Sequence, residues 1–498
     1  MNIRQFLRHH GIQRNPFAEE DAQTDPVFKE SCIAHTFHPA WDKVYGDPRE
    51  PSTAIVFGRK GSGKTAMRLQ VARHLEEFNR EYPDERVFVI TYDDFNPFLD
   101  RFREAVRYRR SNPEKLLQRW KLWDHIDAIL SIGVTSLVDS ITSEKVEPLS
   151  VSPHRLESLP RHVARDLLLL AACYDQSMAQ PVTSRWRRLK KKLKFSNLAA
   201  YVPLATGVAT SALWLIALIS LGVNGQFSWF TSLWYLWVAA LVGGWAWYGV
   251  RWLRWTWRSA GIRRRCRVLH HTVGTLRERL LSVPARDLVG QPLPDKDSTD
   301  DRYELLIKFQ TVLKALGYHG VIVLVDRVDE PELINGAPPR MKALVWPMFD
   351  NKFLKHPGLG IKMMLPAELK PFIDREDAAF YERARLDKQN MIPSFEWTPE
   401  ALLDVANARI RACAEGNRRP TLADLLDEAI SGGRVLQALH DLRVPRHLFK
   451  FAYRLFVAHC NAHSETDPVW RVQPQTFETE LALYLREQDA FERGVGAG

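Results

Sequence analysis

Acidic residues are absent from one long part of this 498-residue chain, between Arg185 and Arg267. Fourteen of the 69 basic residues lie in that part. The rest of the chain therefore has 55 basic and 59 acidic residues, although the whole chain carries a net charge of +10. The positive charge is therefore concentrated in one segment. This pattern favours a membrane-associated segment over a protein that binds nucleic acid along its whole surface.

Cysteine is scarce, and its spacing gives neither a C-x-x-C pair nor a histidine partner at metal-binding distance. The five residues are scattered along the chain: Cys32, Cys173, Cys266, Cys413 and Cys460. This excludes a disulfide scaffold and a zinc site of the usual spacing, and we expect reduced packing residues in the cytoplasm. The segment Met1–Phe17 is polar, so we expect no cleaved signal peptide.

Charged residues of either sign are missing from Phe195 to Val250. This run divides at Val223–Phe227, where an Asn-Gly pair predicts a turn, into two apolar stretches near the ~20 residues that cross a bilayer. Aromatic side chains crowd the second stretch and continue beyond it, as is typical at the headgroup level: Trp229, Trp234, Tyr235, Trp237, Trp245, Trp247, Tyr248, Trp252, Trp255 and Trp257. The pattern predicts a two-helix transmembrane hairpin, with a buried soluble hairpin as the alternative.

Basic residues flank both ends of the predicted hairpin. They are Arg185, Arg187, Arg188, Lys190, Lys191, Lys192 and Lys194 before it, and Arg251, Arg254, Arg258, Arg263, Arg264, Arg265 and Arg267 after it. Because lysine and arginine remain on the cytoplasmic side, both termini are expected there. The sequence therefore predicts a two-pass membrane protein, with the lipid bilayer as a partner.

A phosphate-binding loop precedes this segment. Gly58–Thr65 reads GRKGSGKT and satisfies G-x-x-x-x-G-K-[ST] between a strand-like run, Ala54–Phe57, and a helical pattern that reaches about Asn79. Backbone N–H groups of such a loop face the β-phosphate, the lysine contacts the terminal phosphates and the hydroxyl ligates magnesium. The sequence therefore predicts an ATP and Mg²⁺ site built by Gly58, Gly61, Ser62, Gly63, Lys64 and Thr65.

An acidic residue ends a second apolar run, far along the chain. Gly320–Val325 is continuously apolar, which is typical of a central parallel strand, and Asp326 follows at its carboxyl edge. We expect Asp326 to coordinate magnesium. Arg327 stands where many ATPases place a glutamate, so the candidates that orient the attacking water are Asp329 and Glu330. If neither reaches that water, slow hydrolysis and a nucleotide-gated switch follow.

Further strands are expected at Arg86–Tyr92, Leu359–Leu365 and Ile392–Trp397, and Thr398-Pro399-Glu400 predicts the start of a helix. Between the last two strands lie Arg383 and Arg385, which are candidates to contact the γ-phosphate of a neighbouring subunit. Surface arginines on a helix are the alternative. Arg446 begins a late helix from which it could reach the nucleotide as part of a lid.

These motifs together resemble the KAP P-loop NTPases of the AAA+/STAND division. The resemblance rests on the GRKGSGKT loop, membrane spans between that loop and the acidic strand, the element Asp326–Glu330 and the pair Pro445-Arg446. It implies a nucleotide-dependent ATPase that organises membrane-associated complexes, and some bacterial members of the group take part in the exclusion of phage.

The predicted fold class is α/β, with a three-layer P-loop NTPase core around a parallel sheet, the transmembrane hairpin and a helical C-terminal lid. Six domains are expected along the chain. They are an N-terminal segment with the first part of the core (1–100), a helical region (101–194), the hairpin (195–250), a juxtamembrane helix with linker (251–300), the second part of the core (301–400) and the lid (401–498).

Three functions fit this sequence, and the first is a membrane-anchored ATPase switch in bacterial defence against phage. It is expected to form a homo-oligomer through small residues of the spans, Gly207, Gly243, Gly244 and Gly249, and to act with a partner protein. The second is an ATP-dependent scaffold or transport-associated ATPase. The third is a nucleic-acid-handling ATPase that binds through the basic run Arg101–Lys121, which is less favoured than a solvated helix face.

Overall fold

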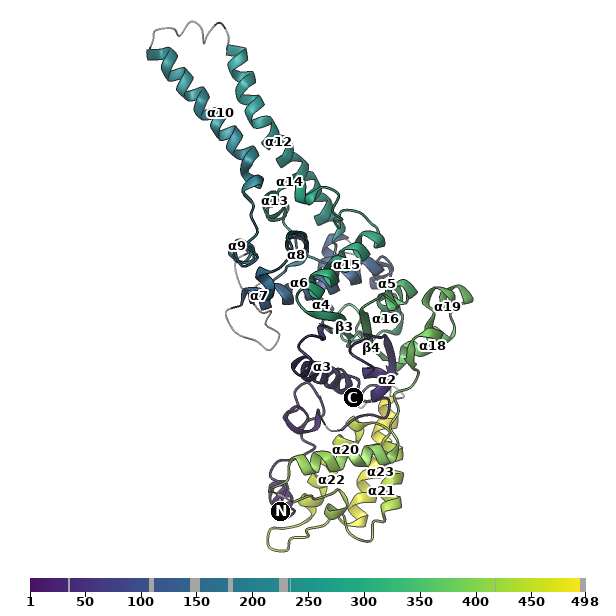
Figure 1. Cartoon of the computed structure of the whole chain (residues 1–498). Helices are drawn as coiled ribbons and strands as arrows, with labels where there is room; N and C mark the ends of the chain where they lie inside the picture. The colour runs from purple at the N-terminus through teal and green to yellow at the C-terminus, as the bar shows by residue number, and fades with distance from the viewer. Residues whose placement is uncertain are drawn as a thin grey trace. The chain divides into compact units, whose positions relative to one another are not determined.

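A computed structural model of the chain describes residues 1–34, 36–106, 112–143, 153–177, 182–223, 232, 234–416 and 418–492. The chain divides into two compact units (Figure 1). Unit 1 comprises Met1–Asp93 and Val321–Gly498, and unit 2 comprises Asp94–Gly320.

A five-stranded sheet with the order β2-β3-β4-β1-β5 makes the fold mixed α/β, as predicted. Its strands are β1 (Ala54–Gly58), β2 (Arg86–Tyr92), β3 (Tyr318–Val325), β4 (Leu359–Pro366) and β5 (Asn390–Ile392). The pairs β1–β4, β1–β5 and β3–β4 are parallel, with Val56 opposite Met364 and Val323 opposite Ile361. Both β1 and β4 are buried along their whole length. Accordingly β1 reads as an unbroken apolar run in the sequence, and β4 is apolar except for Lys362.

The fifth strand differs from its prediction. A strand over Ile392–Trp397 was expected, whereas β5 ends at Ile392. Pro393 has no N–H group to donate to a ladder, so the strand stops before it. The chain still runs beside β1, because the Phe395 amide donates to the Phe57 carbonyl at 2.8 Å.

The N-terminal residues of unit 1 share a hydrophobic core with its C-terminal helices (Figure 1). Phe6, Phe17 and Phe28 belong to this core together with side chains of the last four helices. The helices of unit 1 are α1 (Ile3–His9), η1 (Phe28–Cys32), α2 (Trp41–Tyr45), α3 (Lys64–Glu81), α16 (Pro338–Val345), η2 (Trp346–Met348), α17 (Asn351–Leu354), η3 (Ala367–Leu369), α18 (Lys370–Asp374), α19 (Ala378–Ala384), η4 (Leu386–Lys388), α20 (Pro399–Ala412), η5 (Ala423–Leu425), α21 (Gly432–Leu442), α22 (Pro445–Ala462) and α23 (Pro474–Glu492). The predicted helix start at Thr398 is correct, and its hydroxyl caps α20 by accepting from the Ala401 amide.

The described residues of unit 2 form helices and their connections, apart from the unit's share of β3. Its helices are α4 (Asn96–Ala105), α5 (Pro113–Leu117), α6 (Leu122–Thr142), α7 (Pro153–Glu157), α8 (Arg161–Tyr174), α9 (Val182–Lys192), α10 (Leu198–Val223), α12 (Trp234–Arg265), α13 (Val273–Leu281), α14 (Ala285–Leu288) and α15 (Thr299–Ala315). Helix α12 ends at Arg265. Thr272 then caps the separate helix α13, because its hydroxyl accepts a hydrogen bond from the Thr275 amide.

Within the described residues, one helix is long and apolar enough to cross a membrane, at Leu198–Leu221 in α10. The partner helix α12 lies against α10, and the Trp245 indole donates to the Ser211 hydroxyl at 2.9 Å. Its described apolar part, Trp234–Val250, is shorter than that of α10 because Arg251 follows. The predicted turn after Val223, at 224–227, and Trp229 lie outside the described residues.

A buried lysine lies in the middle of β4. The Lys362 side chain is 1% exposed, and its ammonium has the Ser52 hydroxyl as a hydrogen-bond partner at 3.5 Å. Burial lowers the pKa of Lys362 to about 8. The charged form therefore destabilises the folded chain.

We predict that Lys362→Met raises the thermal stability near neutral pH. Between pH 8 and the ordinary lysine value of about 10.4, the unfolded chain binds more protons, so wild-type stability rises with pH through this window. Below it the cost is fully present, at about 3 kcal/mol. Thermal unfolding followed by tryptophan fluorescence should give a higher Tm for Lys362→Met near neutral pH, and its Tm should not rise with pH through this window. The control Lys355→Met, at an exposed position, should keep the wild-type rise of Tm with pH. Equal pH profiles for wild type and Lys362→Met would contradict the assignment.

Candidate active site

The loop Gly58–Thr65 leaves the carboxyl end of β1 and enters α3, as the motif predicts. Gly61 and Gly63 have φ angles of +82° and +95°, a left-handed conformation that favours glycine. A Cβ atom at Gly61 would lie 2.6 Å from the Cβ of Arg446. The loop thus requires glycine both for its curvature and for the close approach of α22. The Ser62 hydroxyl is fully buried in this curve and has no hydrogen-bond partner among the described residues.

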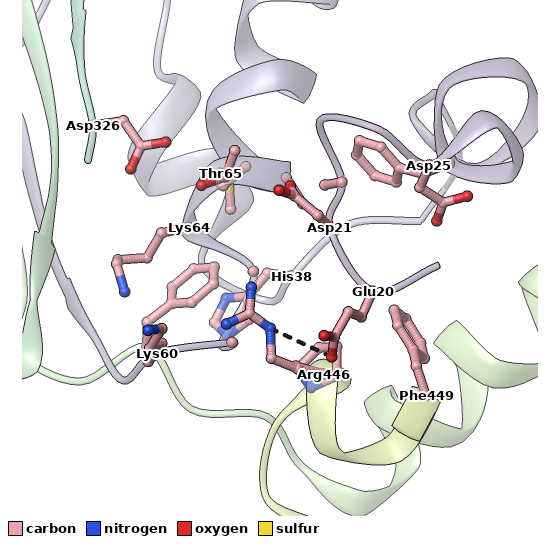
Figure 2. Close-up of a pocket in the computed structure, with 18 of the residues that line it drawn as sticks. Glu20, Asp21, Asp25, His38, Lys60, Lys64, Thr65, Asp326, Arg446 and Phe449 are labelled. Atoms are coloured by element: carbon pink, nitrogen blue, oxygen red, sulfur yellow. Dashed lines mark ion pairs between the residues drawn. The ribbon is translucent and has the colours of Figure 1, made fainter. Parts of the chain in front are cut away.

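The Lys64 ammonium is folded back over this loop (Figure 2). It donates to the carbonyl oxygens of Gly58 at 2.7 Å and Arg59 at 3.0 Å. Burial lowers the pKa of Lys64, although the carboxylates of Asp326 and Asp329 favour its charged form. These two carbonyl contacts hold the cation where phosphate oxygens would replace them as acceptors.

Asp326 and Thr65 meet at the carboxyl edge of the sheet, although they are far apart in the sequence (Figure 2). Asp326 is 2% exposed, and the Thr65 hydroxyl donates to its carboxylate. Burial raises the pKa of Asp326, against the Arg68 guanidinium and this hydrogen bond, which lower it. One carboxylate and one hydroxyl suit Mg²⁺, which takes its other ligands from water and substrate phosphates. No group of three or more His, Cys, Asp or Glu side chains suited to a metal occurs in the described part of the chain.

The buried Arg68 side chain links Asp326 to the partly exposed Asp93, and these two ion pairs were not predicted from the sequence. The Arg68 Nε donates to Asp326 Oδ2 at 3.2 Å, and the Arg68 Nη2 lies 3.1 Å from Asp93 Oδ2. Arg68 follows Thr65 by about one helical turn, and Asp93 directly follows β2. The position of Asp93 at the end of a strand was a usable signal, because parallel strands end at one edge of a sheet.

The two candidates for orienting water, Asp329 and Glu330, both line the cavity beside the loop. Arg327 has a φ angle of 59° and lies 3.4 Å from Glu330 and 3.7 Å from Asp21 in ion pairs. Burial raises the pKa of Glu330, although Arg327 opposes this. Glu368, which follows β4, lines the same cavity and was given no role from the sequence.

Arg446 lines the cavity from the start of α22, and its backbone amide donates to the Gly61 carbonyl at 3.3 Å. Its Nε lies 3.9 Å from Glu20 Oε2 (Figure 2). The Lys450 ammonium lies 3.2 Å from the same oxygen. The other predicted arginines are elsewhere in this chain. Arg385 ends α19 with a φ angle of 47°, Arg383 lies over the Phe380 ring, and neither lines the cavity.

Aromatic side chains from distant segments complete the cavity, which has a volume of about 340 Å³. The His38 ring stacks on Phe395 with centroids 3.7 Å apart, and the Trp397 indole donates to the Ser62 carbonyl at 2.7 Å. Phe28 and Phe449 extend the apolar wall. These residues were not predicted from the sequence, because segments far apart in the chain come together at the loop only through tertiary packing.

His38 is a neutral part of this wall. Its Nδ1 accepts from the Ala40 amide at 3.0 Å, so Nε2 carries the proton and donates to the Glu396 carbonyl at 2.7 Å. Burial lowers the pKa of His38 to about 4. The ring therefore acts as a flat, uncharged surface near neutral pH.

No known protein family matches this chain, and no curated protein or solved structure matches it either. The likeness to KAP P-loop NTPases therefore remains a hypothesis carried by the motifs and their order along the chain.

We predict that Glu20→Gln strengthens ATP binding by about two- to fivefold, because this carboxylate competes with phosphate for the cations of Arg446 and Lys450. Equilibrium titration with a fluorescent ATP analogue measures the change. Glu19→Gln, at the neighbouring exposed position, should bind like wild type. Unchanged or weaker binding in Glu20→Gln would show that the carboxylate does not compete.

Proposed function

We propose that this chain is a magnesium-dependent ATPase that works as a nucleotide-gated switch and is anchored in the membrane by α10 and α12. The observation that carries this proposal is the convergence of Lys64, Thr65 and Asp326 at one edge of the sheet. A P-loop lysine, a hydroxyl and a strand-end carboxylate at one point are the groups that phosphoryl transfer from ATP requires. The three-layer NTPase core of the KAP type is part of the same proposal.

Each part of the site has a task in this reaction. Backbone N–H groups of the loop and the start of α3 bind the phosphate chain, and Lys64 contacts its terminal oxygens. Mg²⁺, held by Thr65 and Asp326, would neutralise charge that develops between the β- and γ-phosphates. Asp329, Glu330 and Glu368 are the cavity carboxylates available to orient water.

The apolar wall suits the base of the nucleotide. His38 and Phe449 offer flat surfaces in the cavity. Arg446 and Lys450, four residues apart on α22, both pair with Glu20 Oε2. Phosphate binding would replace Glu20 as the partner of the Arg446 side chain and so release Glu20 from α22, which already contacts the loop through the Arg446 amide. This exchange is the proposed switch, with Arg385 reserved for a neighbouring subunit of a homo-oligomer.

The membrane part of the proposal rests on the apolar surfaces of α10 and α12. Large apolar side chains are exposed along α10, including Leu213, Ile216 and Val223, and along α12, including Val242 and Trp247. Lipid is the solvent that such surfaces suit, and the basic flanks favour two passes through a bacterial inner membrane with cytoplasmic termini. A role in defence against phage, together with a partner protein, is the biological function we propose.

A nucleic-acid-handling role is less favoured by the described side chains. In the basic run Arg101–Lys121, Arg101 pairs with Glu104 at 3.1 Å and Arg103 with Asp100 at 3.4 Å. Local acids therefore neutralise part of its charge. Arg107, Arg109 and Arg110 lie outside the described residues.

An ATP-dependent scaffold or transport-associated ATPase is the other candidate function. It would use the same nucleotide site and would differ in the role of the membrane helices.

ATP turnover by the detergent-purified full chain tests the proposal. We predict that Lys64→Ala and Asp326→Asn each lower the rate by about a hundredfold or more, because both remove charge stabilisation at the transferred phosphoryl group. Asp329→Asn, Glu330→Gln and Glu368→Gln then identify the residue that orients water. Lys355→Gln, at an exposed position that does not line the cavity, is the matched control. Wild-type rates in both Lys64→Ala and Asp326→Asn would contradict the proposed function.

A further inference from the structure

A second cavity lies within unit 2, where the apolar helices meet the helices α9 and α13 (Figure 1). Its volume is about 480 Å³. Its wall comes from α9, the first turns of α10, the part of α12 where the charge-free run ends, and α13 with the residues that follow it. The lining residues are Thr183, Trp186, Arg187, Lys190, Ala200, Tyr201, Leu204, Tyr248, Arg251, Trp252, Gly274, Thr275, Arg277, Glu278, Arg279, Leu281 and Ser282.

The lining of this cavity is strongly basic. Five cationic side chains face it, and Glu278 is the one acidic residue in the lining. The cations come from three helices and are Arg187, Lys190, Arg251, Arg277 and Arg279. Such an excess of one charge in a partly enclosed space attracts an anion.

Arg251 is the most informative of these residues. It is 8% exposed, and its guanidinium donates to the carbonyls of Ala200 at 2.8 Å, Leu281 at 2.9 Å and Val283 at 2.8 Å. Its Nε has no hydrogen-bond partner among the described residues. Neutral carbonyls orient the guanidinium without cancelling its charge. A buried arginine with no carboxylate among these partners is costly unless an anion completes its surroundings.

The rim combines cations with aromatic rings. The Arg277 guanidinium lies 4.4 Å from the centroid of the Trp252 ring, and Lys190 donates to the Ser282 carbonyl at 3.3 Å. Trp252 is 38% exposed and Tyr201 is 48% exposed. Exposed Trp and Tyr beside a basic pocket are typical of the level at which lipid headgroups lie.

We propose that this cavity binds the phosphate of an anionic phospholipid headgroup, with the acyl chains lying along the apolar surfaces of α10 and α12. The inference rests on the proposed membrane anchoring and does not depend on nucleotide. A lipid fits better than a free anion, because the exposed apolar side chains Tyr201, Val202 and Val208 continue from the cavity along α10.

Native mass spectrometry of the full chain in detergent micelles tests this site. The probes are phosphatidylglycerol, phosphatidylcholine with the same acyl chains, and soluble glycerol phosphate. Phosphatidylglycerol should bind in preference to phosphatidylcholine, and glycerol phosphate should not compete at equal concentration. The double variant Lys190→Gln with Arg277→Gln should bind phosphatidylglycerol about thirtyfold more weakly, because each of the two cations contributes about 1 kcal/mol to such binding.

The matched control removes two charges from exposed positions of α12, in Arg263→Gln with Arg264→Gln, and should bind like wild type. Arg251→Gln provides a third test, with retained fold checked by tryptophan fluorescence, and should also lose the preference. Equal losses in both double variants, or equal binding of the two lipids, would overturn the site. Equal competition by glycerol phosphate would overturn its assignment to a lipid.

The proposed nucleotide site and the proposed lipid site can be tested independently. Lys64→Ala should bind phosphatidylglycerol like wild type, because Lys64 belongs to unit 1 and the lipid site to unit 2. A chain that stays soluble without detergent and does not associate with vesicles would contradict the membrane part of the proposed function. Vesicle insertion without headgroup preference would contradict the lipid site alone.

Discussion

Parallel pairing of β1, β4 and β3 is the constraint on which the candidate site depends. The register that sets Val56 opposite Met364 and Val323 opposite Ile361 aligns the ends of these strands. The loop after β1 and Asp326 after β3 therefore emerge at the same edge, on either side of β4. The contact between Thr65 and Asp326 follows from this alignment, and the ion pairs of Arg68 with Asp93 and Asp326 join a third strand end to it.

The same sheet explains how a large helical unit fits inside the chain. Unit 2 spans Asp94–Gly320, between β2 and β3, which are neighbours in the sheet. An insertion between two adjacent strands leaves their pairing intact, so the loop and Asp326 can form one site around it. Helix α10, which is long and apolar enough to cross a membrane, and the basic cavity both belong to this insertion. Nucleotide chemistry and the proposed lipid contacts are thus assigned to separate units of one chain.

Buried strands and the glycine-rich loop were predictable from the sequence because their residue patterns are local. Four strands lie where the apolar runs predicted them, and Lys64 and Asp326 approach each other as expected. The fifth strand was predicted to extend too far, because Pro393 has no N–H group for a strand ladder and ends β5 at Ile392, despite the apolar residues after it. Glu20 and His38 could not be assigned, because they reach the loop through packing that no local pattern encodes. Of the predicted hairpin, α10 has the length and composition of a membrane span.

Calorimetric titration of ATP into the purified full chain, with and without magnesium, tests the central claim most directly. The account predicts one ATP bound per chain, tighter binding with magnesium in the wild type, and no gain from magnesium in Asp326→Asn. Loss of binding in Lys64→Ala would tie that signal to the loop. Absence of ATP binding by the folded wild-type chain, or equal gains from magnesium in wild type and Asp326→Asn, would contradict the account.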